Sequence, residues 1–506
     1  MFKIEIEESP ILVEVSMETQ KIEKERKASY RKIHLSFFIF MLIQVLFYFT
    51  FSEPFTALFG IESIIPRPPD EVISRTARLI MIYHSLSVPF VVANTFWILE
   101  FYNIRERWIP TLKTLLIPGG YISGTFGMLF AYTRVRIFHE FFYFGLFLVF
   151  LGGIVFIVSA FPIPGKFPDP KKDRKGANIL GMNWEHVNLI ILAVCVLIST
   201  LYGAFAALEN FTGTIWDLGR PTEAFLPEAI VRHGHHDIVE RFIVSHLHIQ
   251  LAQSTAMVLM VAYRTSKIEG RVYSIVLLFN AIGVMVISYG AWILNHFQIW
   301  VGAGLLIICT VLMAQAGFKN VIKDNIGAEN YESASRSVKI KAMVSDPVRF
   351  AYYFLWVYSQ FVVTICGIAV GLQTDDLYRT HGMDILEYTF NVGHWHLLST
   401  VIATLLMIKA IDFYNIQGRS RKIAGWMFFV GSTMAFGFVN VYMLRHLERP
   451  PLYDGIALFF TFLGVWILFS AFIFAIFLIA RKYRRDNKDK KAANLLLISD
   501  QVIQER

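Results

Sequence analysis

Apolar runs of 18 or more residues recur from one end of this 506-residue sequence to the other, separated by short polar links. Each run is long enough to cross a bilayer as a helix. The pattern predicts an all-α, polytopic membrane protein of about twelve transmembrane helices. The expected spans are roughly 34–52, 79–100, 111–132, 140–161, 186–208, 240–263, 272–296, 299–318, 347–372, 388–411, 421–444 and 455–480.

Lysine and arginine collect in alternate links along the chain. These are RKASYRK before the first span, NIRERW, GKFPDPKKDRKG, YRTSKIEGR, the 319–346 link, QGRSRK and ARKYRRDNKDKK after the last span. Such an excess marks the cytoplasmic side of a membrane protein. We therefore expect a multi-pass protein of the cell's cytoplasmic (inner) membrane with both termini in the cytoplasm. The net charge of +8 then reflects topology, and no nucleic-acid partner is expected.

The domain organisation expected from this pattern is simple. Residues 1–33 form a cytoplasmic N-terminal tail, 34–482 form the twelve-helix membrane domain, and 483–506 form a basic cytoplasmic C-terminal tail. All three cysteines lie inside apolar runs, so neither a disulfide framework nor a thiolate metal site is expected.

Three stretches of the chain are similar to one another: ARLIMIYHSLSVPFVVANTFWILEFY, ERFIVSHLHIQLAQSTAMVLMVAYR and EYTFNVGHWHLLSTVIATLLMIKAIDFY. Each has a histidine near the outer face and runs inward to a tyrosine at a basic link. The leading histidines are His84, His246 and His394, which open the second, sixth and tenth expected spans. A repeat at every fourth span predicts three pseudo-symmetric groups of four helices.

Six histidines are expected at one depth in the membrane. They are His84, His246, His248, His394, His396 and His296, the last of which is expected to end the seventh span. An ionisable side chain within a span is costly and points to a function. A single such histidine is as readily a hydrogen-bonded core residue, but six at one depth are not easily explained in that way.

The spacing of two histidines favours haem as the ligand. On a helix, residues i and i+2 point about 200° apart. His394 and His396 therefore face different sides, and each is able to hold a separate haem. Neutral imidazole is a common axial ligand of haem iron. Because no thiolate or carboxylate accompanies these histidines, haem b is favoured over an iron–sulfur cluster or structural zinc.

With these features the sequence resembles subunit I of the haem–copper oxidase superfamily, and within it the nitric oxide reductase branch. The resemblance covers nearly the whole chain. It implies that His84, in TARLIMIYH, and His396 are the axial ligands of a low-spin haem b, and that His394 is the proximal ligand of a second haem b. Arg445 and Arg449 resemble the arginines that hold haem propionates in this family, and ordinary surface charge is the alternative.

The distal metal site of that family is altered in this sequence. The family takes one histidine from span six, matched by His246 in VSHLHIQ, and a His-His pair from span seven. The segment NHFQIWVG resembles the reductase pattern GHHYYWIG, but Phe297 follows His296 where the second histidine should stand. Gln250 stands where nitric oxide reductases have a glutamate. We therefore expect a distal copper or non-haem iron that is weakly bound or absent.

Other histidines and one tyrosine remain open candidates. His248 is a conceivable third metal ligand, hindered because it faces away from His246 on one helix. Tyr289 precedes His296 by seven residues, hence on the same helix face, and an ordinary buried tyrosine is the favoured interpretation. A metal or propionate contact and a solvated cluster are equal alternatives for the outer-link histidines, which are His233, His235 and His236.

Three functions are consistent with the sequence. The leading one is a divergent reductase of NO or O2, with His246, His296 and Gln250 in catalytic positions. The second is a non-catalytic diheme electron carrier, in which His394 and His246 or His248 clamp the second haem. The third is a transporter, which predicts broken helices and no haem. No copper or c-type haem module lies on this chain, so electrons must come from a quinol or a cytochrome c-type subunit, and an additional membrane subunit is expected.

Overall fold

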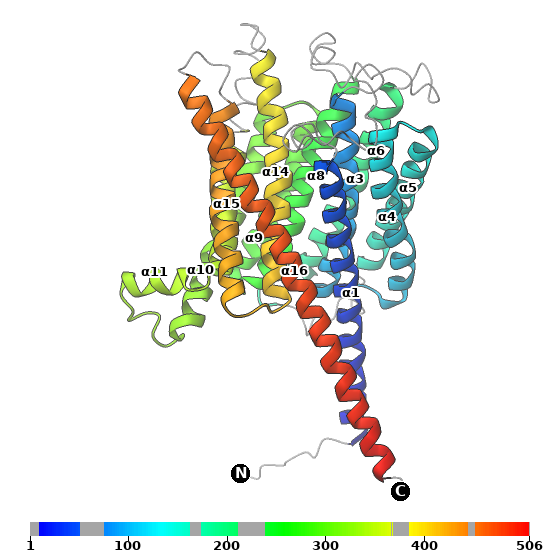
Figure 1. Ribbon diagram of the computed structural model, residues 1–506, viewed down its shortest axis with the longest axis vertical. Helices are drawn as coiled ribbons and strands as arrows, with labels where there is room; N and C mark the ends of the chain where they lie inside the picture. Colours follow the sequence, from blue (N-terminus) through cyan, green and yellow to red (C-terminus); the bar gives the residue numbers. More distant parts are fainter. Residues whose placement is uncertain are drawn as a thin grey trace.

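The computed structural model of the chain describes residues 10–50, 75–161, 174–210, 238–365, 367, 384–443 and 451–504. Long helices dominate these ranges and lie side by side in one bundle (Figure 1). In chain order they are α1 (Pro10–Thr50), α3 (Arg75–Phe101), α4 (Ile109–Thr133), α5 (Arg136–Ala160), α6 (Trp184–Asn210), α8 (Ile238–Thr265), α9 (Gly270–Trp292), α10 (His296–Ile326), α12 (Pro347–Ser359), α14 (Asp384–Phe413), α15 (Arg419–Met443) and α16 (Pro451–Gln504).

Short elements connect some of these helices. The link before α4 contains the 3-10 helix η1 (Glu106–Trp108), and α11 (Arg336–Val344) lies between α10 and α12. A π-helix, η4 (Gln360–Ile365), continues directly from α12. Strands β1 (Asn178–Ile179) and β2 (Met182–Asn183) pair antiparallel before α6.

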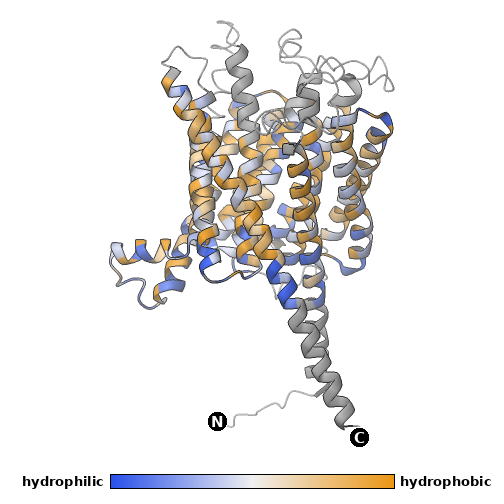
Figure 2. Cartoon of the chain, viewed as in Figure 1, coloured by the Kyte–Doolittle hydropathy of each residue, from blue (hydrophilic) through white to orange (hydrophobic). Residues whose placement is uncertain are grey.

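Nine helices in the described ranges are long and apolar enough to cross a membrane. Figure 2 shows that apolar residues cover the bundle, while hydrophilic residues gather toward the end where α11 lies. The expectation of an all-α, polytopic membrane protein is therefore confirmed. The other three expected spans coincide with α8, with α14, and with α12 followed by η4. Twelve spans in three groups of four nevertheless stay a prediction.

Helices α1 and α16 extend beyond the bundle at one end, which we name the tail end, and α11 lies at that end too (Figure 1). Part of the N-terminal tail expected at 1–33 belongs to the bundle. Tyr30 is buried, Lys113 donates a hydrogen bond to Ser29 at 2.9 Å, and Arg31 pairs with Glu100 at 2.8 Å. The boundary of the packed membrane domain therefore lies before residue 34.

The boundary between the seventh and eighth expected spans was misplaced. Helix α9 ends at Trp292, and the chain reverses through Leu294, which has a left-handed φ of 54°. The side chain of Asn295 then accepts a hydrogen bond from the Gln298 N–H at 3.1 Å and caps α10. An N-cap asparagine satisfies a backbone donor that would otherwise lack a partner. His296 therefore begins α10 and does not end the preceding span.

The three helices that carry the repeated histidines contact one another. α8 packs against both α3 and α14, and Phe413 of α14 lies against Trp97 and Phe101 of α3. The tyrosines that close the three repeats are all buried. Each donates its hydroxyl hydrogen: Tyr102 to the Met260 carbonyl at 2.8 Å, Tyr263 to Asn280 at 3.4 Å, and Tyr414 to the Arg31 carbonyl at 2.7 Å. The repeated residues thus anchor corresponding ends of central helices.

Candidate functional site

Two of the six candidate histidines face each other inside the bundle. The imidazole ring of His84 on α3 and that of His246 on α8 are within 3° of parallel, and their centroids lie 5.9 Å apart. Offset parallel aromatic rings that pack together commonly have centroids about 4.5–7 Å apart, so this separation is that of a packed, parallel pair. Both histidines are partly buried. The pair therefore brings two imidazoles together from helices distant in sequence.

The ring of His246 is held in one orientation by α6. Its Nδ1 lies 2.8 Å from the carbonyl oxygen of Ser199, which only accepts, so Nδ1 carries the proton and donates it. In return the Ser199 hydroxyl donates to the carbonyl of His246 at 2.9 Å. With Nδ1 protonated, Nε2 carries the lone pair. A backbone carbonyl that fixes the tautomer in this way is the usual outer partner of a metal-ligating histidine.

Small residues on α6 allow this close approach. Gly203 follows Ser199 by one helical turn, and both lie against His246. A Cβ added at Gly203 would come within 2.7 Å of Cε1 and of Nδ1 of the His246 ring. Small residues four apart are a common means of close helix packing in membranes. Their signal in the sequence is a serine and a glycine four residues apart in an apolar run.

The ring of His84 lies against an aromatic side chain. The edge of Phe142 on α5 meets it at an interplanar angle of 88° and a centroid distance of 6.3 Å. Phe142 is itself fixed by the tight packing of α4 on α5, since a Cβ at Gly127 would lie 2.9 Å from its ring. His84 thus sits between α8 and α5 in an apolar, aromatic setting.

The separation of the two imidazoles can be compared with that of two ligands on one metal ion. Metal–nitrogen bonds of about 2 Å place two imidazoles on opposite sides of one metal ion with ring centroids about 6 Å apart. The observed separation of 5.9 Å agrees with this value. The protonated Nδ1 of His246 leaves the other nitrogen as the donor atom, as coordination needs. Imidazole is a donor that haem iron accepts, and the same separation is also usual for packed aromatic rings.

The candidates for the distal metal do not gather into one group. His248 and Gln250 lie partly buried on α8, and His296 lies at the start of α10. Among the residues that the structure describes, no three His, Cys, Asp or Glu side chains are grouped so that they could hold a metal ion. The assignment of His246, His248 and His296 as ligands of a distal metal stays a prediction.

Two side chains near His296 point to the surface. Phe297 is 60% exposed and Tyr289 is 59% exposed. The expectation of a buried Tyr289 was wrong, and so was its shared helix face with His296, because α9 ends at Trp292 before the chain turns. A tyrosine on the outside of the bundle is in no position to complete an internal metal site.

Several expected site residues lie outside the described part of the structure. His394 and His396 are on α14, but their side chains are not among those described. The segments that contain the remaining candidates lie entirely outside the described residues. These candidates are Arg445, Arg449, His233, His235 and His236. The roles that the resemblance implies for them stay predictions.

A buried acid that hydropathy and histidine spacing do not indicate lies near the tail end. Glu185, at the start of α6, has a side chain only 1% exposed, and it pairs with Arg264 of α8 and accepts a hydrogen bond from Tyr273 of α9. One turn further in, Asn280 donates to Asn188 at 2.9 Å. These polar pairs tie α6, α8 and α9 together below the histidine pair.

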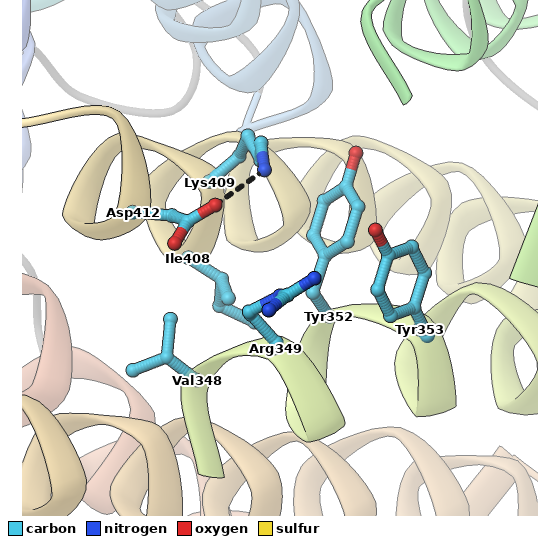
Figure 3. Close-up of a pocket in the computed structure, with 7 residues that line it drawn as sticks. All are labelled: Val348, Arg349, Tyr352, Tyr353, Ile408, Lys409 and Asp412. Carbon is cyan, nitrogen blue, oxygen red and sulfur yellow. Dashed lines mark hydrogen bonds and ion pairs between the residues drawn. The ribbon is translucent and has the colours of Figure 1, made fainter. Parts of the chain in front are cut away.

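A second charged cluster joins α12, α14 and α15 at the tail end. Lys409, with a side chain 8% exposed, lies 2.6 Å from Asp412, and Arg421 bridges Asp412 and Asp346 at 3.0 and 2.9 Å. Figure 3 shows Lys409 and Asp412 above a narrow hollow, with Tyr352 and Arg349 across from them. The charges neutralise one another, so this cluster has the character of a structural lock between helices.

Comparison with known proteins adds no relative. The chain matches no family model, and no curated protein or solved structure is similar enough to be counted as a relative. The class that the fold defines is therefore an all-α polytopic membrane protein. Within that class, its distinguishing feature is the pair formed by His84 and His246.

Proposed function

We propose that this chain is a membrane haem protein of respiratory electron transfer, a divergent relative of the haem–copper oxidases and nitric oxide reductases that reduces NO or O2. The observation that carries the proposal is the parallel pair of His84 and His246, one of them oriented by a backbone carbonyl. Intramembrane histidines are costly and are retained for function. Electrons come from a quinol or a cytochrome c-type subunit.

The architecture that goes with this proposal has twelve spans in three groups of four. It is supported by the contacts among α3, α8 and α14, which carry the three repeated histidines. Both termini are cytoplasmic, because α1, α16 and the lysine- and arginine-rich α11 segment share the tail end. The histidine pair then lies in the outer half of the membrane.

Two haem b groups per chain are proposed, and each supplies an iron that accepts and passes on single electrons. The chain's own residues bind and orient these groups. Ser199 fixes the His246 tautomer, and Phe142 supplies an apolar neighbour for His84. Low solvent access is one of the means by which a protein sets a haem's reduction potential.

A second candidate function is a non-catalytic diheme electron carrier. It is favoured by Phe297 and Gln250, which stand where the family has ligands of the distal metal. Two imidazoles without a carboxylate or a third histidine make a weak metal site. The two candidates differ in whether one haem has an open axial position.

Purified, cofactor-replete protein tests both. A pyridine haemochrome assay should give two b-type haems per chain. Carbon monoxide binding to the reduced protein, together with metal analysis, then separates the two candidates. A CO-reactive haem supports the reductase, whereas two CO-inert haems without copper or non-haem iron support the carrier. Protein that contains no haem would refute both.

A further inference from the structure

The helix α11 and the loop before it project sideways from the tail end of the bundle and do not continue along its axis (Figure 1). This segment combines lysines with exposed apolar side chains. We propose that the end of α10 and α11 together form a binding site for the headgroup of an anionic phospholipid, in the leaflet on the tail-end side. The proposal does not depend on haem, so it goes beyond the proposed function and is tested separately from it.

Helix α10 is longer than a bilayer requires. It has 31 residues, from His296 to Ile326. At a rise of 1.5 Å per residue this is about 46 Å, whereas the hydrocarbon core of a bilayer is about 30 Å thick. The expected apolar span ends at Phe318, and the part of the helix that follows carries Lys319 and Lys323. These lysines therefore lie at the depth where ammonium groups meet lipid headgroups.

Aromatic side chains mark the same level on the neighbouring helices. Trp426 of α15 is 41% exposed, and its ring lies 6.2 Å from that of Phe350 of α12. The Phe350 ring lies 6.2 Å from that of Phe318 of α10. Because tryptophan is enriched at the boundary between membrane and water, this row of rings places the boundary at Phe318. Lys319 directly follows it.

Three lysines converge on one tyrosine beyond this boundary. The ammonium nitrogens of Lys319 and Lys323 of α10 and of Lys339 of α11 lie 5.5, 5.3 and 4.7 Å from the centroid of the Tyr331 ring. An aromatic ring attracts an exposed cation only weakly, and the three positive charges repel one another. A phosphate group bound between the lysines would neutralise them through charge-assisted hydrogen bonds.

The acids of the same segment do not neutralise this cluster. Asp324 pairs instead with Lys267 at 3.7 Å and with Arg349 at 2.8 Å. Glu329 and Glu332 are exposed in the loop before α11. Within the described part of the chain, no ion pair joins either glutamate to the three lysines. The cluster therefore keeps its positive charge available for an anion from outside the chain.

Helix α11 also has apolar side chains that suit the border of the acyl chains. Val338 is 46% exposed and Ile340 is 59% exposed. Helices that lie in the membrane interface bury such residues among lipids and keep their lysines near anionic headgroups. The segment is held in place on α10, because the side chain of Asn325 donates a hydrogen bond to the Ala342 carbonyl at 3.0 Å. The combination of lysines and apolar residues favours a lipid over a free phosphate ion.

Lipid titration followed by native mass spectrometry of the purified full chain tests the site. Phosphatidylglycerol is the anionic probe and phosphatidylcholine the zwitterionic one, and we expect preferential binding of the former. One lysine near an anionic surface contributes about fivefold to affinity. The triple variant K319Q/K323Q/K339Q should therefore bind phosphatidylglycerol at this site on the order of 100-fold more weakly. The control K32Q/K175Q/K422Q removes the same charge from three other exposed lysines and should keep the site.

Two further measurements separate charge from folding and lipid from free anion. The variant K319R/K323R/K339R keeps the charge and should bind phosphatidylglycerol as the wild type does. Inorganic phosphate at millimolar concentration should not displace the lipid. Equal binding of the two lipids by the wild type, unchanged binding in the glutamine variant, loss of binding in the arginine variant, or displacement by phosphate alone would each overturn the proposal. None of these outcomes bears on whether the chain holds haem.

Discussion

Gly203 lies directly against the ring of His246, so that a single added carbon would fall 2.7 Å from its Nδ1 and Cε1. This contact links a residue of α6 to a candidate haem ligand of α8. It makes the position of the imidazole dependent on the absence of a side chain.

The substitution G203A should therefore disturb the haem site. Overpacking of this kind costs about 1–3 kcal/mol and forces the neighbour to move. We expect a smaller low-spin haem signal in absorption or electron paramagnetic resonance spectra. G304A is the matched control, because a Cβ at Gly304 of α10 meets nothing within 4 Å. Equal spectra for the two variants would show that the Gly203 contact does not position the ring.

The pair of Glu185 and Arg264 should be important for stability. Removing one partner of a buried ion pair leaves an uncompensated charge and costs about 3–5 kcal/mol. E185A should therefore lower the melting temperature of the detergent-solubilised protein clearly. Glu140, which pairs with Arg136 at 3.6 Å on the exposed face of α5, supplies the control. E140A should cost about 0.3–0.5 kcal/mol, and a similar loss in both variants would contradict the expected role of burial.

In the charged cluster at the tail end, loss of Asp412 should destabilise the protein more than loss of Lys409. D412A leaves Lys409 buried next to Arg421 without its acid, and should cost about 3–5 kcal/mol. K409M keeps the aliphatic stem and leaves Asp412 paired with Arg421, so it should cost about 1–2 kcal/mol. Thermal unfolding of both variants measures the difference. A K409M protein less stable than D412A would show that Lys409, and not Asp412, is the centre of the cluster.

The orientation of the chain can be tested at its C-terminus. The basic tail end is expected in the cytoplasm, where lysine and arginine are retained. A green fluorescent protein fused after residue 506 should fluoresce, and alkaline phosphatase fused there should be inactive. Fusions in the link at 211–237 provide the control and should give the opposite result. An active phosphatase at the C-terminus would reverse the topology and place the histidine pair in the cytoplasmic half.

Much of the fold could be predicted from the sequence, because an apolar run in a bilayer has few alternatives to a helix that satisfies its own backbone. Glu100 and Asp412 lie at the ends of α3 and α14, and each is paired with an arginine. Helix ends were less certain. The turn at Leu294 and Asn295 was missed because both flanking segments are apolar. The hydropathy pattern therefore does not show that one helix ends and another begins there.

The sequence by itself determined that His84 and His246 lie in apolar helices, near the first third of each. Only the tertiary structure decided that the ring of His84 faces that of His246, and that Ser199 and Gly203 hold the latter in place. The rotation and approach of packed helices depend on small residues and backbone carbonyls of other helices, and no hydropathy pattern records these contacts. For the same reason the pairing of Glu185 with Arg264 depends on the packing of α6 against α8 and is not apparent from the sequence.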